Sequence, residues 1–152
     1  FNPKGGLFFT IDKRNSLYAS VAIAHREPNR SAYRDADPGQ TISAERLIDF
    51  ESGYKYQSKK ISLEANYYYM KYRDQLVLTG KINNVGDPIL VNVPNSYRTG
   101  LELSGGVQII KSLRWDMNLT LSCNKITDFV GYTDNWDTWP EQKVDTLGTT
   151  GH

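Results

Sequence analysis

Apolar and polar residues alternate with a period of two through several stretches of the chain. From Ile61 to Tyr69 the odd positions are apolar or aromatic, whereas even positions carry polar groups such as Ser62, Glu64 and Asn66. Because successive side chains of a β-strand point to opposite faces, this alternation predicts strands with one apolar face and one polar face. No helical period of useful length competes with it.

The same pattern predicts about six long strands joined as an antiparallel up-and-down meander. Three short segments, 12–15, 57–60 and 110–112, each separate two alternating runs and predict tight hairpin turns. Longer polar segments alternate with these turns and are expected to be loops, at 26–45, around 82–95 and everywhere after Phe129. The expected strands are 6–11, 16–25, 47–57, 61–78, 90–110 and 113–127.

In the second, third, fifth and sixth expected strands, one parity is apolar over a run that no charged residue interrupts. In the last strand this parity holds Leu113, Trp115, Met117, Leu119 and Leu121, opposite polar residues at the even positions. Such a face is stable against either a protein core or a lipid bilayer, and soluble β-sandwiches alternate in the same way. The predicted fold class is therefore all-β, and the surroundings of the apolar face decide the function.

Three features favour a bilayer over a soluble core. Strands of about ten residues or more exceed the five or six of typical globular sheets and match the 9 to 11 that cross a bilayer when tilted. Large aromatic residues lie near strand ends, as in the aromatic girdles of membrane barrels. Short turns that alternate with long loops are typical of outer-membrane barrels, whose short turns are periplasmic. We therefore expect a segment of a transmembrane β-barrel.

Composition excludes several other classes of protein. The 152 residues, 39% of them hydrophobic, suffice for one domain or for a piece of a larger one. A net charge of +1 predicts no binding of nucleic acid, and no apolar run reaches the roughly 18 residues of a membrane helix. The single cysteine, Cys123, excludes an internal disulfide. The chain begins without Met and ends in loop-like residues, so a fragment is expected.

Four phrases of the sequence resemble the C-terminal part of the barrel of TonB-dependent outer-membrane receptors. They are Asn-Ser-Leu-Tyr-Ala-Ser at 15–20 with His-Arg-Glu-Pro-Asn-Arg at 25–30, Glu-Arg-Leu at 45–47 running into Glu-Ser-Gly-Tyr-Lys at 51–55, Leu-Glu-Ala-Asn-Tyr-Tyr-Tyr-Met at 63–70, and Asn-Ser-Tyr-Arg-Thr-Gly-Leu-Glu-Leu at 95–103. The likeness covers nearly the whole chain, so residues 1–152 are expected to be a single barrel segment without the plug domain or the remaining strands.

This resemblance implies an active transporter and not an enzyme. Receptors of the family have about 22 strands around a plug, of which this chain would supply roughly a quarter. They take up a scarce nutrient across the outer membrane of Gram-negative bacteria, most often a ferric siderophore. The implied partners are the lipid bilayer, TonB acting through the plug, and the small-molecule nutrient or ferric chelate, with no cofactor. A soluble β-sandwich that binds carbohydrate and a small self-contained barrel remain as alternatives.

A loop of cations and aromatics after the second expected strand is the main candidate ligand site. Its guanidinium and imidazole groups are able to bind an anionic ferric chelate through charge-assisted hydrogen bonds. The simpler interpretation is a solvated loop whose arginines pair with Glu27, Asp35 and Asp37. The candidate residues are His25, Arg26, Arg30, Tyr33 and Arg34.

Two tryptophans near the C-terminus are a second candidate. Trp136 and Trp139 offer flat surfaces to a sugar or a catechol, although loop packing or an interfacial anchor is the favoured interpretation. The neighbouring Asp134 and Asp137 lack the Gly and the closing Glu of a calcium loop, so no metal site is expected. Acids and bases on the polar parity are spread evenly along the strands, which favours a charged lumen wall over a catalytic pair.

Overall fold

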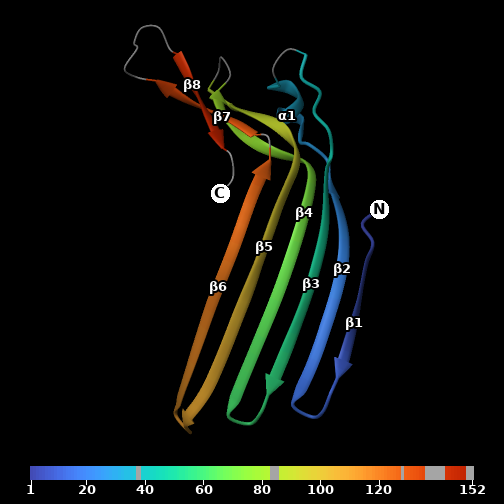
Figure 1. The fold of residues 1–152 in the computed structure, drawn as a ribbon, viewed down its shortest axis with the longest axis vertical. Coiled ribbons are helices and arrows are strands. Elements are labelled where there is room, and N and C mark those ends of the chain that lie inside the picture. The colour runs from blue at the N-terminus through green and yellow to red at the C-terminus, as the bar shows by residue number, and fades with distance from the viewer. Residues whose placement is uncertain (37–38, 83–85, 128, 136–142, 150–152) are drawn as a thin grey trace. The chain divides into compact units, whose positions relative to one another are not determined.

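The computed structural model describes residues 1–36, 39–82, 86–127, 129–135 and 143–149, and its main feature is a six-stranded sheet (Figure 1). The strands follow one another across the sheet in sequence order, from β1 to β6. This arrangement confirms the predicted antiparallel up-and-down meander. Their bounds are β1 (Lys4–Thr10), β2 (Asn15–Arg26), β3 (Glu45–Gln57), β4 (Ile61–Ile82), β5 (Pro88–Ile110) and β6 (Leu113–Thr127).

Polar side chains close the short turns at their predicted places, between β1 and β2 and between β3 and β4. Asp12 Oδ1 accepts hydrogen bonds from the backbone N–H of Arg14 at 2.7 Å and of Asn15 at 2.9 Å. The hydrogen bond from Arg14, followed by those from Asn15, holds the pKa of Asp12 below its ordinary value. Ser58 Oγ accepts from the N–H of Ile61 at 3.0 Å and so closes the second turn. These local bonds fix the register of each hairpin.

The longer connections differ from the prediction. β4 has 22 residues and β5 has 23, so both extend into the segment that was expected to be a loop. A five-residue helix, α1 (Arg30–Arg34), interrupts the expected 26–45 loop, and Asn29 Oδ1 caps it by accepting from Ala32 N–H at 2.9 Å. The expectation of a loop after Phe129 is also wrong, because β7 (Phe129–Asn135) pairs antiparallel with β8 (Lys143–Thr149). Among the described residues no helix is long and apolar enough to span a membrane.

The chain forms two compact units that bury apolar side chains to different extents. Unit 1 comprises Phe1–Ala24, Leu47–Lys71 and Tyr97–Asn124, and unit 2 comprises His25–Arg46, Tyr72–Ser96 and Lys125–His152. On β6 in unit 1, the apolar parity from Leu113 to Leu121 is 47–58% exposed. The buried hydrophobic side chains of the described residues all belong to unit 2, and they are Ala32, Ile42, Tyr72, Ile89 and Val93.

In unit 2, backbone N–H and carbonyl groups form hydrogen bonds with side chains from distant segments. Ser43 and Asn92 exchange two hydrogen bonds, from Ser43 N–H to Asn92 Oδ1 at 2.8 Å and from Asn92 Nδ2 to the Ser43 carbonyl at 3.0 Å. Gln40 Nε2 donates to the carbonyl of Leu90 at 2.9 Å. The segment between α1 and β3 is therefore fastened to the start of β5 and closes the small core.

Candidate functional site

The polar face of unit 1 is held together by a tyrosine that reaches across a whole strand. Tyr18 on β2 extends over Gly53 on β3, and its hydroxyl donates to Asn66 Oδ1 on β4 at 2.9 Å. A Cβ at position 53 would lie 2.3 Å from Cζ of Tyr18, so only glycine permits this crossing. Lys55 Nζ lies 2.9 Å from Glu64 Oε1 and 5.3 Å from the centre of the Tyr18 ring. These contacts confirm that the predicted polar parities of three strands share one face.

An arginine makes a second crossing of the same kind, from β6 to β4. Arg114 passes over Gly106 on β5, where a Cβ would lie 2.2 Å from Nη2, and donates to Ser62 Oγ at 2.9 Å. Its Nε also lies 2.9 Å from Asp116 Oδ1. The charges named on this face are therefore paired across and along the strands. Such pairing suits the wall of a polar lumen.

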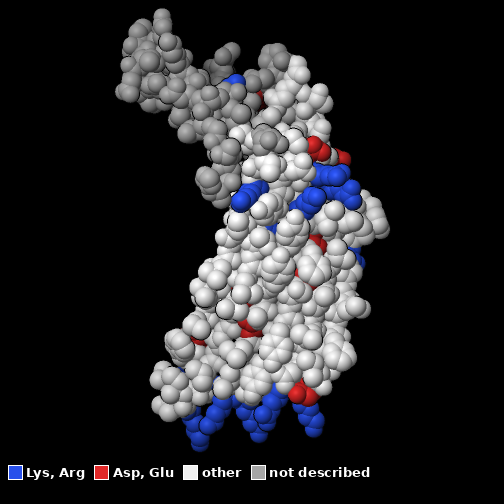
Figure 2. Space-filling model, viewed as in Figure 1, with Lys and Arg blue, Asp and Glu red and all other residues white. Residues whose placement is uncertain are grey.

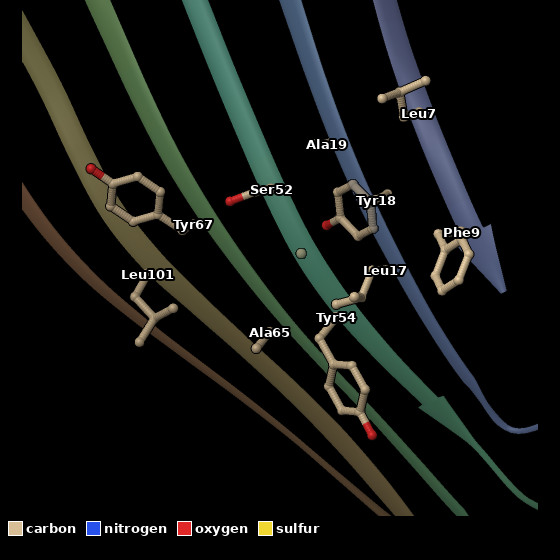
Figure 3. A pocket seen from close by; sticks show the side chains of 11 residues that line it. Leu7, Phe9, Leu17, Tyr18, Ala19, Ser52, Tyr54, Ala65, Tyr67 and Leu101 are labelled. Atoms are coloured by element: carbon tan, nitrogen blue, oxygen red, sulfur yellow. The ribbon is translucent and has the colours of Figure 1, made fainter. Parts of the chain in front are cut away.

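The opposite, apolar face of unit 1 carries a shallow depression of about 500 Å³ (Figure 3). Its lining includes four small residues, Ala19, Ser52, Gly53 and Ala65. Hydrocarbon suits this surface better than a polar solute, because nearly all of the lining side chains are apolar or aromatic. The larger lining residues are Leu7, Phe9, Leu17, Tyr54, Tyr67 and Leu101 of the apolar parity, together with the Tyr18 ring, which lies over Gly53.

Arg26, from the predicted ligand loop, lies in unit 2 and is ion-paired. Its Nη2 is 3.0 Å from Oε2 of Glu45, whose side chain is only 9% exposed. The same carboxylate oxygen accepts from the backbone N–H of Leu76 at 3.2 Å. Glu45 thus connects β2, β3 and β4, while the side chain of Arg26 remains 65% exposed. The sequence interpretation paired the loop arginines with nearer acids, and it missed this partner.

Arg34, at the end of α1, is held between two carboxylates. Its Nε and Nη2 each lie 2.8 Å from an oxygen of Asp35, and Nη2 is also 3.0 Å from Oδ2 of Asp87. The Asp35 carboxylate raises the pKa of the Arg34 guanidinium, and Asp87 contributes further. The expected pairing with Asp35 is therefore confirmed, whereas Asp37 lies outside the described residues. Most of the charge of Arg34 is already balanced within the protein.

The other candidates of this loop are exposed. His25, Arg30 and Tyr33 all lie at the surface, with Tyr33 55% exposed. Arg30 forms no ion pair with any residue in the part of the chain that the structure describes. Its charge is accordingly the most available of the three arginines. That these residues contact a ligand stays a prediction.

A depression of about 310 Å³ lies beside Arg26 in unit 2. Of the predicted residues only Arg26 lines it, and the sequence analysis missed the apolar side, which Leu76 of β4 and Leu90 of β5 provide. No local pattern signals that these two leucines meet a loop that follows β2. One cation, one carboxylate and an apolar side suit a small amphipathic molecule. The remaining lining residues are Glu27, Pro28, Asn29 and Ala32.

The C-terminal candidates are not placed by the structure. Trp136, Trp139 and Asp137 lie outside the described residues, and Asp134 belongs to β7. Within the described ranges there is no group of three or more His, Cys, Asp or Glu side chains arranged to hold a metal ion.

Comparison with known proteins gives one family. The β-barrel model of the TonB dependent receptor-like family matches residues 1–151. No curated protein matches the sequence. Solved structures with the same fold include a copper transporter, OprC, at 18% identity and a TM-score of 0.69, covering 80% of this chain and 20% of that one.

Two further structures are similar to this chain. The siderophore receptor PirA from Pseudomonas aeruginosa is 19% identical with a TM-score of 0.67, and the match covers 82% of this chain and 25% of that one. The FrpB iron transporter from Neisseria meningitidis is 20% identical with a TM-score of 0.63, over 82% and 20% of the two chains. At these identities the likeness shows the fold alone, and the chain spans only a fifth to a quarter of each structure. Because the family model covers all but the last residue, the chain belongs to the TonB-dependent receptor-like β-barrel family.

Proposed function

We propose that this chain is part of the barrel wall of an active transporter in the outer membrane of a Gram-negative bacterium. The whole protein takes up a scarce nutrient, and a ferric siderophore is the first candidate. Family membership supports this proposal, as do a siderophore receptor and an iron transporter among the proteins of the same fold. Residues 1–152 supply barrel strands, and TonB acts through a plug domain elsewhere in the protein.

The observation that carries the proposal is the contrast in burial between the two units. Unit 2 buries a small apolar core, whereas the apolar parity of unit 1 remains exposed. In water an apolar surface of this extent would be unfavourable, but a bilayer solvates it. The parts of β2 to β6 in unit 1 are about 10 to 14 residues long, close to the 9 to 11 that a tilted strand needs to cross a bilayer.

The ends of the apolar runs support the same limits for the membrane span. Along each strand the apolar parity gives way to a polar or charged side chain close to the boundary between the units. A charge near the interface costs far less than one at the midplane, so this boundary is a natural edge for the hydrocarbon. The polar or charged residues of this parity near the boundary are His25, Arg46, Lys71, Asn95 and Lys125.

The exposed cations of unit 2 support an anionic ligand. Arg30 has no ion-pair partner among the described residues, and Arg26 lines a depression with apolar and polar sides. A charge-assisted hydrogen bond contributes about 1.5–3 kcal/mol, so Arg30→Gln should weaken binding of a ferric siderophore by at least about tenfold. Arg34→Gln is the matched control, because Asp35 and Asp87 already balance its charge, and its effect should be several-fold smaller.

Uptake by intact cells tests the proposal. A strain that lacks the receptor gene would be given the full-length gene and offered a panel of siderophores labelled with radioactive iron. We expect uptake of at least one chelate that disappears without the receptor, without TonB or with a protonophore. Uptake that is unchanged by loss of the gene, or a receptor that fractionates with soluble protein, would contradict the proposal.

The soluble β-sandwich is the weaker alternative. It requires the apolar faces of the sheet to be buried against one another, whereas on β6 the residues of that parity are at least 47% exposed. In the described residues the six strands form one sheet.

A further inference from the structure

The short turns of unit 1 carry an unusual density of positive charge. The turns comprise residues 11–14, 58–60 and 111–112, and we call their five cations the cationic rim. Figure 2 shows Lys and Arg side chains projecting together from the edge of the molecule where these turns lie. All five side chains are exposed, so the rim presents its charge to whatever surrounds that edge. The rim consists of Lys13, Arg14, Lys59, Lys60 and Lys111.

No carboxylate of the described residues forms an ion pair with the rim. The one acid in these turns is Asp12, and its carboxylate is already hydrogen-bonded to Asn15 and to the backbone N–H of Arg14. In contrast, the arginines Arg26 and Arg114 each have a carboxylate within 3.0 Å. The rim therefore lacks the neutralisation that Arg26 and Arg114 receive, and its concentrated positive charge favours an anionic partner outside the chain.

The apolar depression of unit 1 begins next to the rim. Tyr54, which lines the depression, donates its hydroxyl to the side-chain oxygen of Asn15. Asn15 Nδ2 in turn donates to Asp12 at 2.9 Å, and the rim residues Lys13 and Arg14 are the next two residues of that turn. A cationic group and an apolar groove thus adjoin one another in the same compact unit.

We propose that the cationic rim and the depression form a binding site for an anionic glycerophospholipid. The rim cations bind the phosphate of the headgroup, and the depression holds part of an acyl chain. The inference rests on the proposed function, because it needs unit 1 to span a bilayer with its short turns at one surface. An acidic protein would match the charge of the rim alone, but only a lipid matches both the charge and the adjoining apolar groove.

Native mass spectrometry of the full-length receptor, purified and stripped of lipid, tests the proposal. Phosphatidylglycerol and the zwitterionic phosphatidylcholine would be titrated onto the wild type and two charge variants at low salt. Each cation near an anionic headgroup strengthens binding about fivefold. Lys59→Gln with Lys60→Gln should therefore weaken phosphatidylglycerol binding about 25-fold. The matched control, Lys4→Gln with Lys71→Gln, removes two exposed charges at the ends of unit 1 strand segments away from the short turns, and it should change binding less than twofold.

The acyl half of the site has its own pair of variants. Ala65→Phe fills the depression and should weaken binding of long-chain phosphatidylglycerol several-fold. Met117→Phe, on the same apolar face but outside the depression, should leave binding unchanged. Circular dichroism of each variant confirms that the barrel is folded.

Three results would overturn the proposal. These are equal affinity for the two lipids, equal losses in the rim variant and its control, and competition by glycerol phosphate as strong as that by the intact lipid. Binding of an acidic peptide that depends on the rim, with lipid binding unaffected, would also overturn it and indicate a protein partner. Failure of the proposed function gives a different result, because the receptor would not insert into lipid vesicles at all.

Discussion

Alanine in place of Gly53 tests whether the missing side chain is what lets Tyr18 cross β3. The new Cβ would lie 2.3–2.4 Å from the tip of the Tyr18 ring, far inside van der Waals contact. The ring would have to leave its position. Its hydrogen bond to Asn66 and its contact with Lys55 would then be lost.

The expected free energies follow from these contacts. The hydrogen bond contributes about 1 kcal/mol, and the cation–π contact about 0.5–1 kcal/mol. Alanine at position 53 offsets about 0.5–1 kcal/mol of this loss in stability, because it restricts the unfolded chain more than glycine does. Gly53→Ala should therefore destabilise the barrel by about 1 kcal/mol. When Tyr18 is already alanine, no ring is displaced, and the same change should stabilise by about 0.5–1 kcal/mol.

Equilibrium urea unfolding of the full-length receptor in lipid vesicles measures this double-mutant cycle. The four proteins are the wild type, the two single variants and the double variant. Gly5→Ala is the control, because a Cβ there meets nothing within 4 Å, and it should be neutral or slightly stabilising in both backgrounds. A Gly53→Ala effect of the same sign and size in both backgrounds would refute the crossing as the reason for the glycine.

Three further predictions concern a turn, unit 2 and the two faces of the sheet. The backbone hydrogen bond from Arg14 lowers the pKa of Asp12 in the folded protein. The contribution of the Asp12 carboxylate to folding stability is therefore complete above its ordinary pKa of 3.8 and is lost as the pH falls through the folded pKa. Urea midpoints of the wild type and of Asp12→Asn should therefore converge on acidification, and a constant gap would be inconsistent with this linkage. Glu45→Ala leaves a β4 N–H unpaired and should destabilise unit 2 by about 1–2 kcal/mol, seen as faster amide exchange in 25–46 and 72–96 but not in 47–71. Leu103→Arg on the apolar parity should cost about 2–4 kcal/mol, and Ser104→Arg on the polar parity about 0.5 kcal/mol; equal urea midpoints of the two variants would contradict the face assignment.

The strands of unit 1 were predictable because the signal for each strand is local. The bounds of β6, Leu113–Thr127, agree with the prediction at both ends. A side chain that faces lipid needs no partner from another segment, so the alternation of a single strand already contains the information. The turns were equally local, because Asp12 and Ser58 close them with atoms no more than three residues away.

Unit 2 was harder to predict because its stability depends on contacts between distant segments. Arg26 pairs with Glu45, 19 residues away, and not with its neighbour Glu27. α1 has a single turn, too short for any helical period, and only Asn29 signals its start. Neither Leu76 nor Leu90 carries a local sign of its place beside the predicted ligand loop.

The crossings of the polar face show a different limit of sequence analysis. The alternation correctly assigns Tyr18 and Arg114 to the polar face. It does not show that each one extends over a glycine to the second strand along, because Gly53 and Gly106 belong to other strands. Which residue lies opposite which depends on register, and register is set by the turns together with the whole sheet.

The central claim is that the apolar parity of unit 1 faces lipid. Nitroxide accessibility tests this claim most directly, with single spin labels at positions 103 and 104 of the full-length receptor in lipid vesicles, after replacement of Cys123 and any other reactive thiol. Oxygen concentrates in hydrocarbon, whereas a hydrophilic nickel chelate stays in water. The collision rates of the spin label with these two reagents therefore show whether it lies in lipid or in water. We predict frequent oxygen and rare nickel collisions at position 103, and a higher ratio of nickel to oxygen collisions at position 104. A label at position 103 that collides with neither reagent would place that face in a protein core and contradict the account.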